Sequence, residues 1–292
     1  MKILNGRLLL EKIKKELALE TALLIKKNNQ PPHLVAILIG TNPASQTYVN
    51  AKVKACRDIG FKSTVVNYPD NVSQDLLISK IKDLNMDEKV NGLIVQLPLP
   101  DHINESLIIH SISHKKDVDG FHPINIGRMV LGLPCYLPAT PFGILSLLNE
   151  YDIDTHGKKC LVIGRSNIVG TPVSILMSRN KKVGNATVTL AHSKTRNINS
   201  LTKDADIIIL ALGVPGYLKS NMIKKHTVII DVGIHRVKSD KTKSGFKLVG
   251  DADFDDIKDK TSFITPVPGG VGPMTIASLL QNTLYSAKKV IY

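Results

Sequence analysis

The stretch from residue 34 to residue 52 reads LVAILIGTNPASQTYVNAK and decides how the first half of the chain folds. Its leading residues, 34–39, are all apolar, which predicts a strand buried on both faces. Asn42 followed by Pro43 marks a helix start, because Asn caps free N–H groups and Pro is tolerated in the first turn. On the predicted helix Tyr48 and Lys52 lie one turn apart and share one face.

The role of Lys52 is open at this point. The neighbouring stripe of Val49, Val53 and Cys56 is apolar and is expected to face the core, so Lys52 lies at the edge of a buried face. A lysine in this position commonly covers apolar surface with its stem and keeps its amine in water. The alternative is a lysine at a ligand cleft, placed for proton transfer. The stretch alone favours the first interpretation.

Strands and helices alternate through the rest of the first half. The predicted helices cover residues 8–27, the segment from 43 onward and 73–84, and the predicted strands cover 34–39, 63–67 and 92–97. This alternation is typical of a parallel α/β sheet. Gln96 ends the third strand, and ligands of such sheets bind outside the strand carboxyl ends. Gln96 and Lys52 are therefore candidates for one crevice, although Gln96 could equally hydrogen-bond a nearby turn.

The segment KDVDGFHP, residues 116–123, carries two carboxylates. Asp117 and Asp119 flank a valine, so they would point the same way if the segment is extended. The alternatives are an aspartate that caps a turn, or one half of a surface ion pair. A metal site needs more convergent ligands than the sequence offers here, so no metal is predicted.

A second strand–loop–helix unit begins at residue 159. The strand 159–163 is followed by GRSNIVG, residues 164–170, an arrangement that presents free N–H groups to a phosphate. The loop departs from G-x-G-x-x-G, because Ser166 replaces the middle glycine and Gly170 comes one residue late. The predicted strands that complete a Rossmann-type sheet cover residues 186–190, 206–210 and 227–231.

The residues after the strand 186–190 indicate which nicotinamide cofactor is bound. NAD-binding folds usually place an acidic residue there for the ribose, whereas this chain has HSKT at 192–195. Arg165, Ser193 and Lys194 are donors suited to a 2′-phosphate, which favours NADP, although Arg165 alone could be an ordinary surface arginine. Ile234 follows the strand 227–231 and is placed to line the nicotinamide side.

The loop PVPGGVGPMT, residues 266–275, precedes the last predicted helix. Its glycines either mark a turn between domains or let the backbone approach a ligand closely. The final helix is expected to pack on the first domain, which makes that domain discontinuous. The predicted domains are therefore 1–139 plus 273–292, and 140–272.

Composition places the chain among ordinary globular proteins. It has 292 residues, 43% of them hydrophobic and 22% charged, with no apolar run long enough for a membrane span. Its first residues do not resemble an export signal, so none is expected. Its net charge of +13 comes from lysines spread along the chain, so no nucleic-acid partner is predicted. The three cysteines lack metal-ligand spacing and indicate a cytoplasmic protein.

Five motifs taken together resemble one family. They are Tyr48-Val49-x-x-Lys52, VQLPLP at 95–100, KDVDG at 116–120, GRS-x-x-VG at 164–170 and P-x-PGGVGPMT at 266–275. In this order they resemble the bifunctional methylenetetrahydrofolate dehydrogenase/methenyltetrahydrofolate cyclohydrolase (FolD) family over essentially the whole chain. The resemblance implies a folate-binding α/β domain with a parallel sheet, a Rossmann-type NADP-binding domain, an active-site cleft between them, and a homodimer.

The resemblance also implies the chemistry and the residues that perform it. The expected substrate is 5,10-methylenetetrahydrofolate, oxidised with NADP⁺ to the methenyl compound, which water then opens to 10-formyltetrahydrofolate, a one-carbon donor for purine biosynthesis. By the family match Lys52 is the key cyclohydrolase residue, Gln96 orients it, Tyr48 stacks on the aminobenzoate ring and Asp119 binds the pterin. The matching cofactor positions are Gly164, Arg165, Ser166, Ser193 and Ile234, and the remaining substrate positions are Pro268, Gly269 and Gly270.

Three other functions compete with this interpretation. A dehydrogenase without cyclohydrolase activity is the nearest, and the presence of Lys52 argues against it. A non-catalytic protein that binds folate or NADP is a second. An RNA-binding Rossmann-like module is a third, suggested only by the positive charge.

Overall fold

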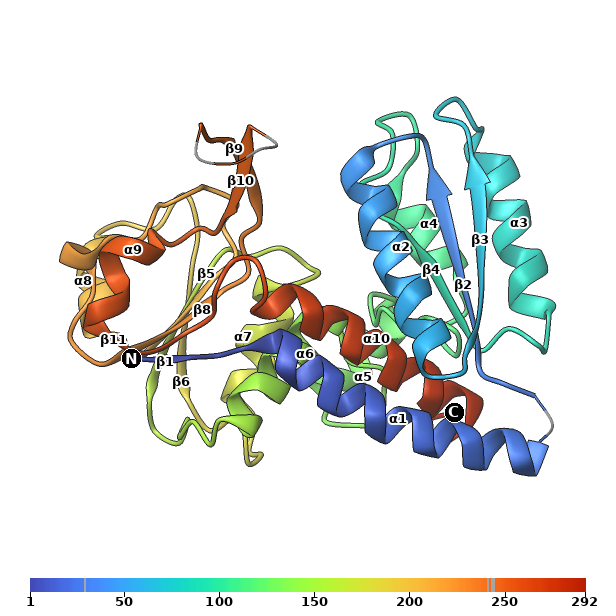
Figure 1. Ribbon diagram of the computed structural model, residues 1–292, viewed down its shortest axis with the longest axis horizontal. Helices are drawn as coiled ribbons and strands as arrows, with labels where there is room; N and C mark the ends of the chain where they lie inside the picture. The colour runs from blue at the N-terminus through green and yellow to red at the C-terminus, as the bar shows by residue number, and fades with distance from the viewer. Residues whose placement is uncertain (29, 241, 243–244) are drawn as a thin grey trace. The chain divides into compact units, whose positions relative to one another are not determined.

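The computed structural model describes residues 1–28, 30–240, 242 and 245–292 (Figure 1). The chain forms two compact units. Residues 11–139 and 276–292 make up the Lys52 unit, and residues 1–10 and 140–275 make up the Gly164 unit. The first ten residues thus belong to a different unit from the one predicted, because β1 (Lys2–Ile3) pairs in parallel with β11 (Thr261–Ile264).

The Lys52 unit is built on a parallel sheet with the strand order β3-β2-β4. The strands are β2 (His33–Ile39), β3 (Lys62–Tyr68) and β4 (Gly92–Val95), and all three were predicted. Every residue of β2 is buried, which confirms a strand covered on both faces. Ile37 of β2 lies opposite Val95 of β4, so both strands end at the same edge of the sheet.

Helices cover the two faces of this sheet. Val35, Ile37 and Ile39 of β2 share a core cluster with residues of α3 (Gln74–Met86) and α4 (Glu105–Ser111). Figure 1 shows α2 (Pro43–Asp58) on the opposite side of the strands from α3. The helices α2 and α3 agree with the prediction, and α1 (Gly6–Asn28) begins two residues before the predicted start. The unit also contains α5 (Pro123–Val130) and most of α10 (Val271–Ala287).

The Gly164 unit is built on a parallel sheet with the strand order β1-β11-β8-β7-β5-β6. The predicted strands are β5 (Lys159–Ile163), β6 (Thr187–Ala191), β7 (Ile207–Leu210) and β8 (Thr227–Asp231), each within one residue of its expected bounds. The strands β1 and β11 were not predicted. Both are short, and β1 is too brief to show a period of apolar residues.

Helices and a hairpin complete the Gly164 unit. The helical segments are α6 (Ala139–Glu150), α7 (Gly170–Ser178), α8 (Ile198–Asp204), η1 (Ser220–Met222), α9 (Phe254–Ile257) and η2 (Lys258–Lys260). Strands β9 (His235–Lys238) and β10 (Phe246–Val249) pair antiparallel and form a hairpin. Positions 241, 243 and 244 of that hairpin tip lie outside the described residues.

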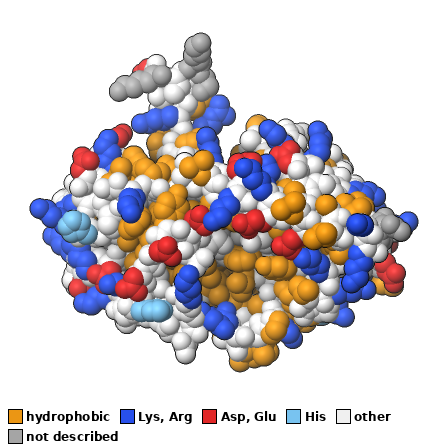
Figure 2. Space-filling model, turned by 60° about the horizontal axis from the view of Figure 1, so that its bottom comes forward, with side chains coloured by type: hydrophobic (Ala, Val, Ile, Leu, Met, Phe, Trp, Pro, Cys, Tyr) orange, Lys and Arg blue, Asp and Glu red, His pale blue; other side chains and the backbone are white. Residues whose placement is uncertain are grey.

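The surface carries charges of both signs. On the face seen in Figure 2, Lys and Arg side chains are scattered among acidic and apolar ones. Such mixing is unlike the continuous basic stripe of a nucleic-acid-binding surface. Among the helices that the structure describes, none combines the length and apolar character required to cross a membrane.

Candidate active site

Local sequence fixes the direction of the helix that carries Lys52. The Asn42 side chain accepts hydrogen bonds from the N–H groups of Ala44 at 2.9 Å and Ser45 at 3.2 Å, and Pro43 occupies the first turn. These contacts satisfy donors that a helix start leaves free. The cap therefore starts α2 directly after β2, and it places Tyr48 and Lys52 on one helix face, as predicted.

Lys52 meets Gln96. Lys52 is only 6% exposed, and its Nζ donates to Gln96 Oε1 at 3.1 Å. The amide of Gln96 has a defined orientation, because its Nε2 donates to the Leu97 carbonyl at 2.7 Å and a carbonyl can only accept. The interpretation of Lys52 as a lysine that extends into water is wrong, since the residue is buried and its amine is bonded to the side chain that follows β4.

The surroundings of Lys52 are of low polarity. Burial raises the pKa of the Tyr48 hydroxyl, one turn before Lys52. Burial also raises the pKa of the Cys56 thiol to about 12, one turn after it, and the Lys52 charge opposes that rise. Desolvation disfavours the charged forms of side chains. The Tyr48 hydroxyl and the Cys56 thiol on this face of α2 are therefore groups whose neutral forms are favoured.

Backbone pairing with β4 positions the segment that carries Asp119 near Lys52 and Gln96. Leu93 of β4 donates its N–H to Lys116 O at 2.8 Å and forms a parallel bridge with Asp117. Because the two segments run in the same direction, Asp119 lies toward the end of β4, where Gln96 follows. Desolvation raises the pKa of Asp119, and the nearby Lys52 charge acts in the opposite direction.

The two aspartates of this segment have different environments, contrary to the expectation for an extended segment. Gly120 N–H donates to Asp117 O at 3.1 Å, so residues 117–120 form a turn. The Asp117 carboxylate faces inward and accepts from His122 N–H at 2.7 Å and Asn125 Nδ2 at 2.9 Å. Burial raises the pKa of Asp117 to about 6. Asp117 thus fixes the turn that leads into α5, whose N-cap residue is His122, and this leaves Asp119 as the candidate ligand group.

In the Gly164 unit, glycines allow the tight connection from β5 to α7. Gly164 has φ +117°, and a Cβ there would come within 2.0 Å of the Ala211 carbonyl oxygen. A Cβ on Gly170 would come within 1.9 Å of the Gly164 carbonyl oxygen. Neither position accepts a side chain without movement of the backbone. These glycines are required by the close approach of β5, the loop and α7.

Ser166 acts within this loop. Its Oγ accepts from Val169 N–H at 3.2 Å and, more weakly, from Gly170 N–H at 3.4 Å, so it caps the start of α7. Within the part of the chain that the structure describes, the backbone N–H groups of residues 165–168 have no acceptor. The donors available to a phosphate are therefore those of the loop that precedes α7, rather than those of the first turn of the helix.

Strand register brings Arg165 and Ser193 to one edge. Ile163 of β5 lies opposite Ala191 of β6, and Gly164 N–H donates to Ala191 O at 2.9 Å. Arg165 and Ser193 each lie two residues beyond this pair, and both are exposed. Adjacent parallel strands thus end with a guanidinium and a hydroxyl, a donor set that matches a phosphate group.

The turn after β6, residues 192–195, leaves the side chain of Lys194 available to bind a ligand. His192 N–H donates to Thr195 Oγ1 at 2.8 Å, and Lys194 N–H donates to His192 Nδ1 at 3.2 Å. These bonds use the backbone of the turn and leave the side chain of Lys194 exposed. Ile234, three residues after β8, is 41% exposed, so its apolar side chain is available for contact.

Pro268, Gly269 and Gly270 lie in the Gly164 unit, in the loop between β11 and α10. The carbonyl of Gly269 accepts from Gly6 N–H at 2.9 Å. A Cβ on Gly6 would come within 1.8 Å of the Gly270 oxygen. The tight backbone packing of this loop against residue 6 thus accounts for part of its glycine content. Contact of these residues with a substrate stays a prediction.

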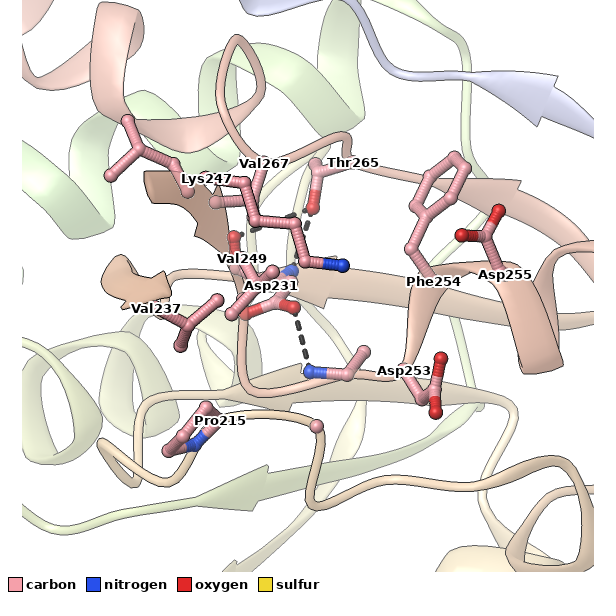
Figure 3. Close-up of a pocket in the computed structure, with 14 residues that line it drawn as sticks. Pro215, Asp231, Val237, Lys247, Val249, Asp253, Phe254, Asp255, Thr265 and Val267 are labelled. Atoms are coloured by element: carbon pink, nitrogen blue, oxygen red, sulfur yellow. Dashed lines mark hydrogen bonds between the residues drawn. The ribbon is translucent and has the colours of Figure 1, made fainter. Parts of the chain in front are cut away.

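Sequence reasoning missed a group of buried ionisable residues in the Gly164 unit. Asp231, Asp251 and His235 form a connected network behind the strand ends, and Asp231 and Thr265 line a pocket with Val237, Val249 and Val267 (Figure 3). The one available signal was an aspartate that ends an otherwise apolar strand at residue 231. The partners of these residues come from distant segments, which no local pattern indicates.

Comparison with known proteins agrees with this geometry. The family model of the tetrahydrofolate dehydrogenase/cyclohydrolase catalytic domain matches residues 4–119, and that of the NAD(P)-binding domain matches residues 138–291. The bifunctional protein FolD of Bacteroides fragilis is 53% identical over 292 residues, covering 100% of both chains.

Solved structures show the same relationship. The bifunctional FolD dehydrogenase/cyclohydrolase of Campylobacter jejuni is 48% identical, with a TM-score of 0.93 over 99% of each chain. The Trypanosoma brucei FolD, solved with NADP and an inhibitor, is 36% identical, with a TM-score of 0.93 over 99% of this chain and 98% of its own. This chain therefore belongs to the tetrahydrofolate dehydrogenase/cyclohydrolase family, the family of the bifunctional FolD proteins.

Proposed function

We propose that this chain is a bifunctional folate one-carbon enzyme. It oxidises 5,10-methylenetetrahydrofolate to 5,10-methenyltetrahydrofolate with NADP⁺, and it hydrolyses that product to 10-formyltetrahydrofolate. The observation that carries the proposal is the buried Lys52–Gln96 pair, an amine held at 3.1 Å by a neutral amide whose own orientation is fixed. Membership of the family supports both reactions.

The Gly164 unit is the proposed NADP-binding domain. The exposed Arg165, Ser193 and Lys194 would hold the 2′-phosphate, and the free N–H groups of residues 165–168 would hold the remaining phosphates. This donor set fits an anionic dinucleotide with a third phosphate group, and it includes no carboxylate that would repel one. When bound, NADP⁺ supplies the hydride acceptor for the methylene carbon.

The Lys52 unit is the proposed folate-binding domain, in which Lys52 serves the hydrolytic step. One N–H bond of Nζ is directed at Gln96, so the lone pair of the neutral amine faces away from the amide. Water adds its oxygen to the methenyl carbon and gives a proton to this lone pair. Cleavage of the bond from that carbon to N5 then leaves the formyl group on N10, with net release of one proton.

Gln96 suits this task because it is uncharged. A carboxylate at the same place would stabilise the ammonium form of Lys52 and remove the proton acceptor. The amide fixes the direction of the amine through one hydrogen bond and adds no charge. Gln96 is therefore proposed as the residue that orients Lys52.

Tyr48 and Asp119 are proposed to hold the substrate. The half-buried ring of Tyr48 offers a stacking surface one turn from Lys52. Asp119 can accept two hydrogen bonds from the amino edge of a pterin when it is ionised. Burial raises the pKa of Asp119, and the Lys52 charge opposes that rise. Pro268, Gly269 and Gly270 are proposed as further substrate contacts.

A direct assay tests the proposed function. Purified protein with methylenetetrahydrofolate and NADP⁺ is expected to produce the methenyl absorbance, and separately supplied methenyl compound should disappear faster than in buffer. Formation of the methenyl compound with hydrolysis no faster than the spontaneous rate would identify a dehydrogenase only. Absence of both reactions would leave a binding protein.

The assembly and location of the chain are also proposed. We expect a homodimer in the cytoplasm, as the family resemblance implies. Within the described residues Cys56, Cys135 and Cys160 form no disulfide, which is typical of a reducing compartment. Light scattering should report twice the chain mass of 31.9 kDa, and a value equal to that mass would contradict the dimer.

A further inference from the structure

Two buried carboxylates lie behind the carboxyl edge of the sheet in the Gly164 unit. Asp231, the last residue of β8, is 3% exposed, and Asp251, after β10, is 0% exposed. Burial of a carboxylate is costly unless hydrogen-bond donors surround it. The identity of those donors therefore indicates what each carboxylate holds in place.

Asp251 binds segments that follow two adjacent strands. Its Oδ2 accepts from the N–H groups of Leu212 at 2.9 Å and Gly213 at 3.1 Å, just after β7. Its Oδ1 is paired with His235 Nε2 at 2.7 Å, in the segment after β8. Since β7 and β8 are neighbours in the sheet, one carboxylate connects both of their outgoing loops.

Asp231 in turn holds the segment that bears Asp251. Its oxygens accept from the N–H groups of Gly233 at 2.9 Å, Asp251 at 3.0 Å and Ala252 at 2.8 Å. Thr265 Oγ1 accepts from Asp231 N–H at 2.7 Å, and Figure 3 shows Asp231 with its hydrogen bonds beside Thr265. The backbone of Asp251 is thus held by hydrogen bonds to a second buried carboxylate, that of Asp231.

The backbone is packed tightly against both carboxylates. A Cβ on Gly233 would lie 2.5 Å from Asp251 Cγ, and a Cβ on Gly250 would lie 1.9 Å from Asp231 Oδ2. Such approaches leave no room for a side chain. The loops after β7, β8 and β10 are therefore held with little freedom to shift.

The loops that Asp251 holds each present an exposed apolar residue. Val214, next to Gly213, is 46% exposed, and Ile234, next to His235, is 41% exposed. Both follow the carboxyl ends of strands, where ligands of parallel α/β sheets bind. An apolar planar ring such as nicotinamide is the kind of group that two exposed aliphatic side chains can contact.

We propose that Asp251, with His235, is a positioning residue for hydride transfer, which holds Val214 and Ile234 where the nicotinamide ring of NADP⁺ binds. The inference rests on the proposed function, in that it takes NADP⁺ as the cofactor of the Gly164 unit. Asp251 itself does not touch the cofactor. It acts through the backbone of residues 212–213 and through His235, and a displacement of about 1 Å in such a support can reduce a rate 100-fold.

The test compares the two activities of single variants. Asp251→Ala should raise the NADP⁺ Kd and KM by about 10- to 100-fold, because Leu212 and Gly213 lose their buried acceptor. Hydrolysis of supplied methenyltetrahydrofolate requires no NADP⁺ and should stay within about 2-fold of wild type. Asp251→Asn keeps one oxygen for these N–H groups and should restore most of the loss.

Two further variants keep the test decisive. The matched control is Asp253→Asn, two positions after Asp251 in the chain. The Asp253 carboxylate accepts a hydrogen bond from Lys219 Nζ at 2.6 Å, and its replacement should leave NADP⁺ binding unchanged. If Asp251→Ala does not fold, His235→Ala removes only one of the contacts and should still raise the NADP⁺ Kd by about 3- to 10-fold.

Two results would overturn the inference. One is a folded Asp251→Ala, or in its place His235→Ala, with wild-type NADP⁺ Kd and KM. The other is a parallel loss of both activities, which would indicate a general structural role. Failure of the proposed function is separate, because it would appear in the wild-type protein as an absence of NADP⁺ binding or of oxidation of the methylene substrate.

Discussion

The Lys52 and Gly164 units place their ionisable groups in opposite ways. In the Lys52 unit the candidate reactive groups are side chains in low-polarity surroundings: Lys52 is buried, and desolvation raises the pKa of Asp119. In the Gly164 unit the candidate ligand groups are exposed, as with Arg165 and Ser193, or are backbone N–H groups. Its buried carboxylates, such as Asp251, face the protein itself and hold loops.

This difference follows from what each unit is proposed to do. A lysine that accepts a proton from water acts in its neutral form, and Gln96 contacts Lys52 without adding a charge that would stabilise the ammonium form. A site for phosphates needs many donors, which exposed side chains and free N–H groups supply without burial of an unpaired charge. We therefore assign proton transfer to buried side chains of the Lys52 unit. We assign cofactor binding to exposed groups of the Gly164 unit, on loops that buried carboxylates hold in place.

The largest expected effect is on Lys52. Lys52→Met keeps most of the apolar stem and removes the amine, so folding and NADP⁺ binding should persist. The cyclohydrolase rate should fall by about 10²- to 10⁴-fold, the usual loss when a general base is removed, while methenyl formation continues. The measurement follows methenyl absorbance with spontaneous hydrolysis subtracted.

Gln96→Glu sharpens this test, because it keeps the size of the side chain and places a carboxylate against Lys52. It should also depress hydrolysis. A wild-type hydrolysis rate in Lys52→Met would show that the lysine is only a structural residue.

The next effect concerns one buried carboxylate in each unit. Burial raises the pKa of both Asp117 and Asp231 to about 6, from 3.8. A folded protein that binds its proton more tightly than the unfolded chain loses stability as pH rises between these values, and the loss is complete above about pH 6. Relative to an Asn variant, each aspartate should lose roughly 2 kcal/mol of unfolding free energy between pH 4.5 and 7.

Denaturant unfolding of wild type, Asp117→Asn and Asp231→Asn at several pH values measures this difference. Asn resembles the protonated acid, so the variants should lack this part of the pH dependence even where lost hydrogen bonds lower their overall stability. A pH-independent difference between wild type and variant would contradict the raised pKa values.

Asp119 offers a test within the Lys52 unit. If it anchors the pterin, Asp119→Ala should impair both reactions together, by about 10-fold or more in kcat/KM, because a shifted carbon misses the geometry for either step. Asp117 is not a suitable control, since its carboxylate is buried and fixes the turn before α5. Retention of both activities at ordinary substrate concentrations would assign Asp119 to the turn alone.

A smaller effect is expected at the exposed edge of the Gly164 unit. Arg165→Ala should raise the NADP⁺ KM by about 10-fold, as expected for the loss of one hydrogen bond to a charged group. The KM for NAD⁺, which has no 2′-phosphate, should change little, and hydrolysis of the methenyl compound should not change. Equal efficiency of the wild type with both cofactors would refute the role of Arg165.

The smallest effects are expected at the two helix caps, which form a matched pair. Asn42→Ala and Ser166→Ala each remove a side chain that accepts from helix N–H groups, at an expected cost of about 1 kcal/mol. The cap of α2 should affect hydrolysis slightly, and the cap of α7 should affect NADP⁺ KM slightly. The reverse pattern would contradict the assignment of hydrolysis to the Lys52 unit and of NADP⁺ binding to the Gly164 unit.

The sequence predicted those features that depend on neighbouring residues. Asn42 and Pro43 indicated the start of α2 because a cap acts within one turn of its own chain. The apolar run before it indicated a buried strand, and the end of β4 indicated where Gln96 would lie. The encounter of Lys52 with Gln96 was foreseeable because parallel strands end at a common edge.

Tertiary structure alone decided the features that depend on distant partners. Asp117 and Asp119 are equivalent in sequence, and only the turn at residues 117–120 directs one inward to α5. Residues 1–10 join the Gly164 unit through the pairing of β1 with β11, more than 250 positions away in the chain. Asp251 finds its donors at residues 212 and 213, and no local pattern marks them. The reason is physical: helix caps and apolar periodicity are satisfied locally, whereas a buried charge is satisfied by whichever donors the completed fold brings to it.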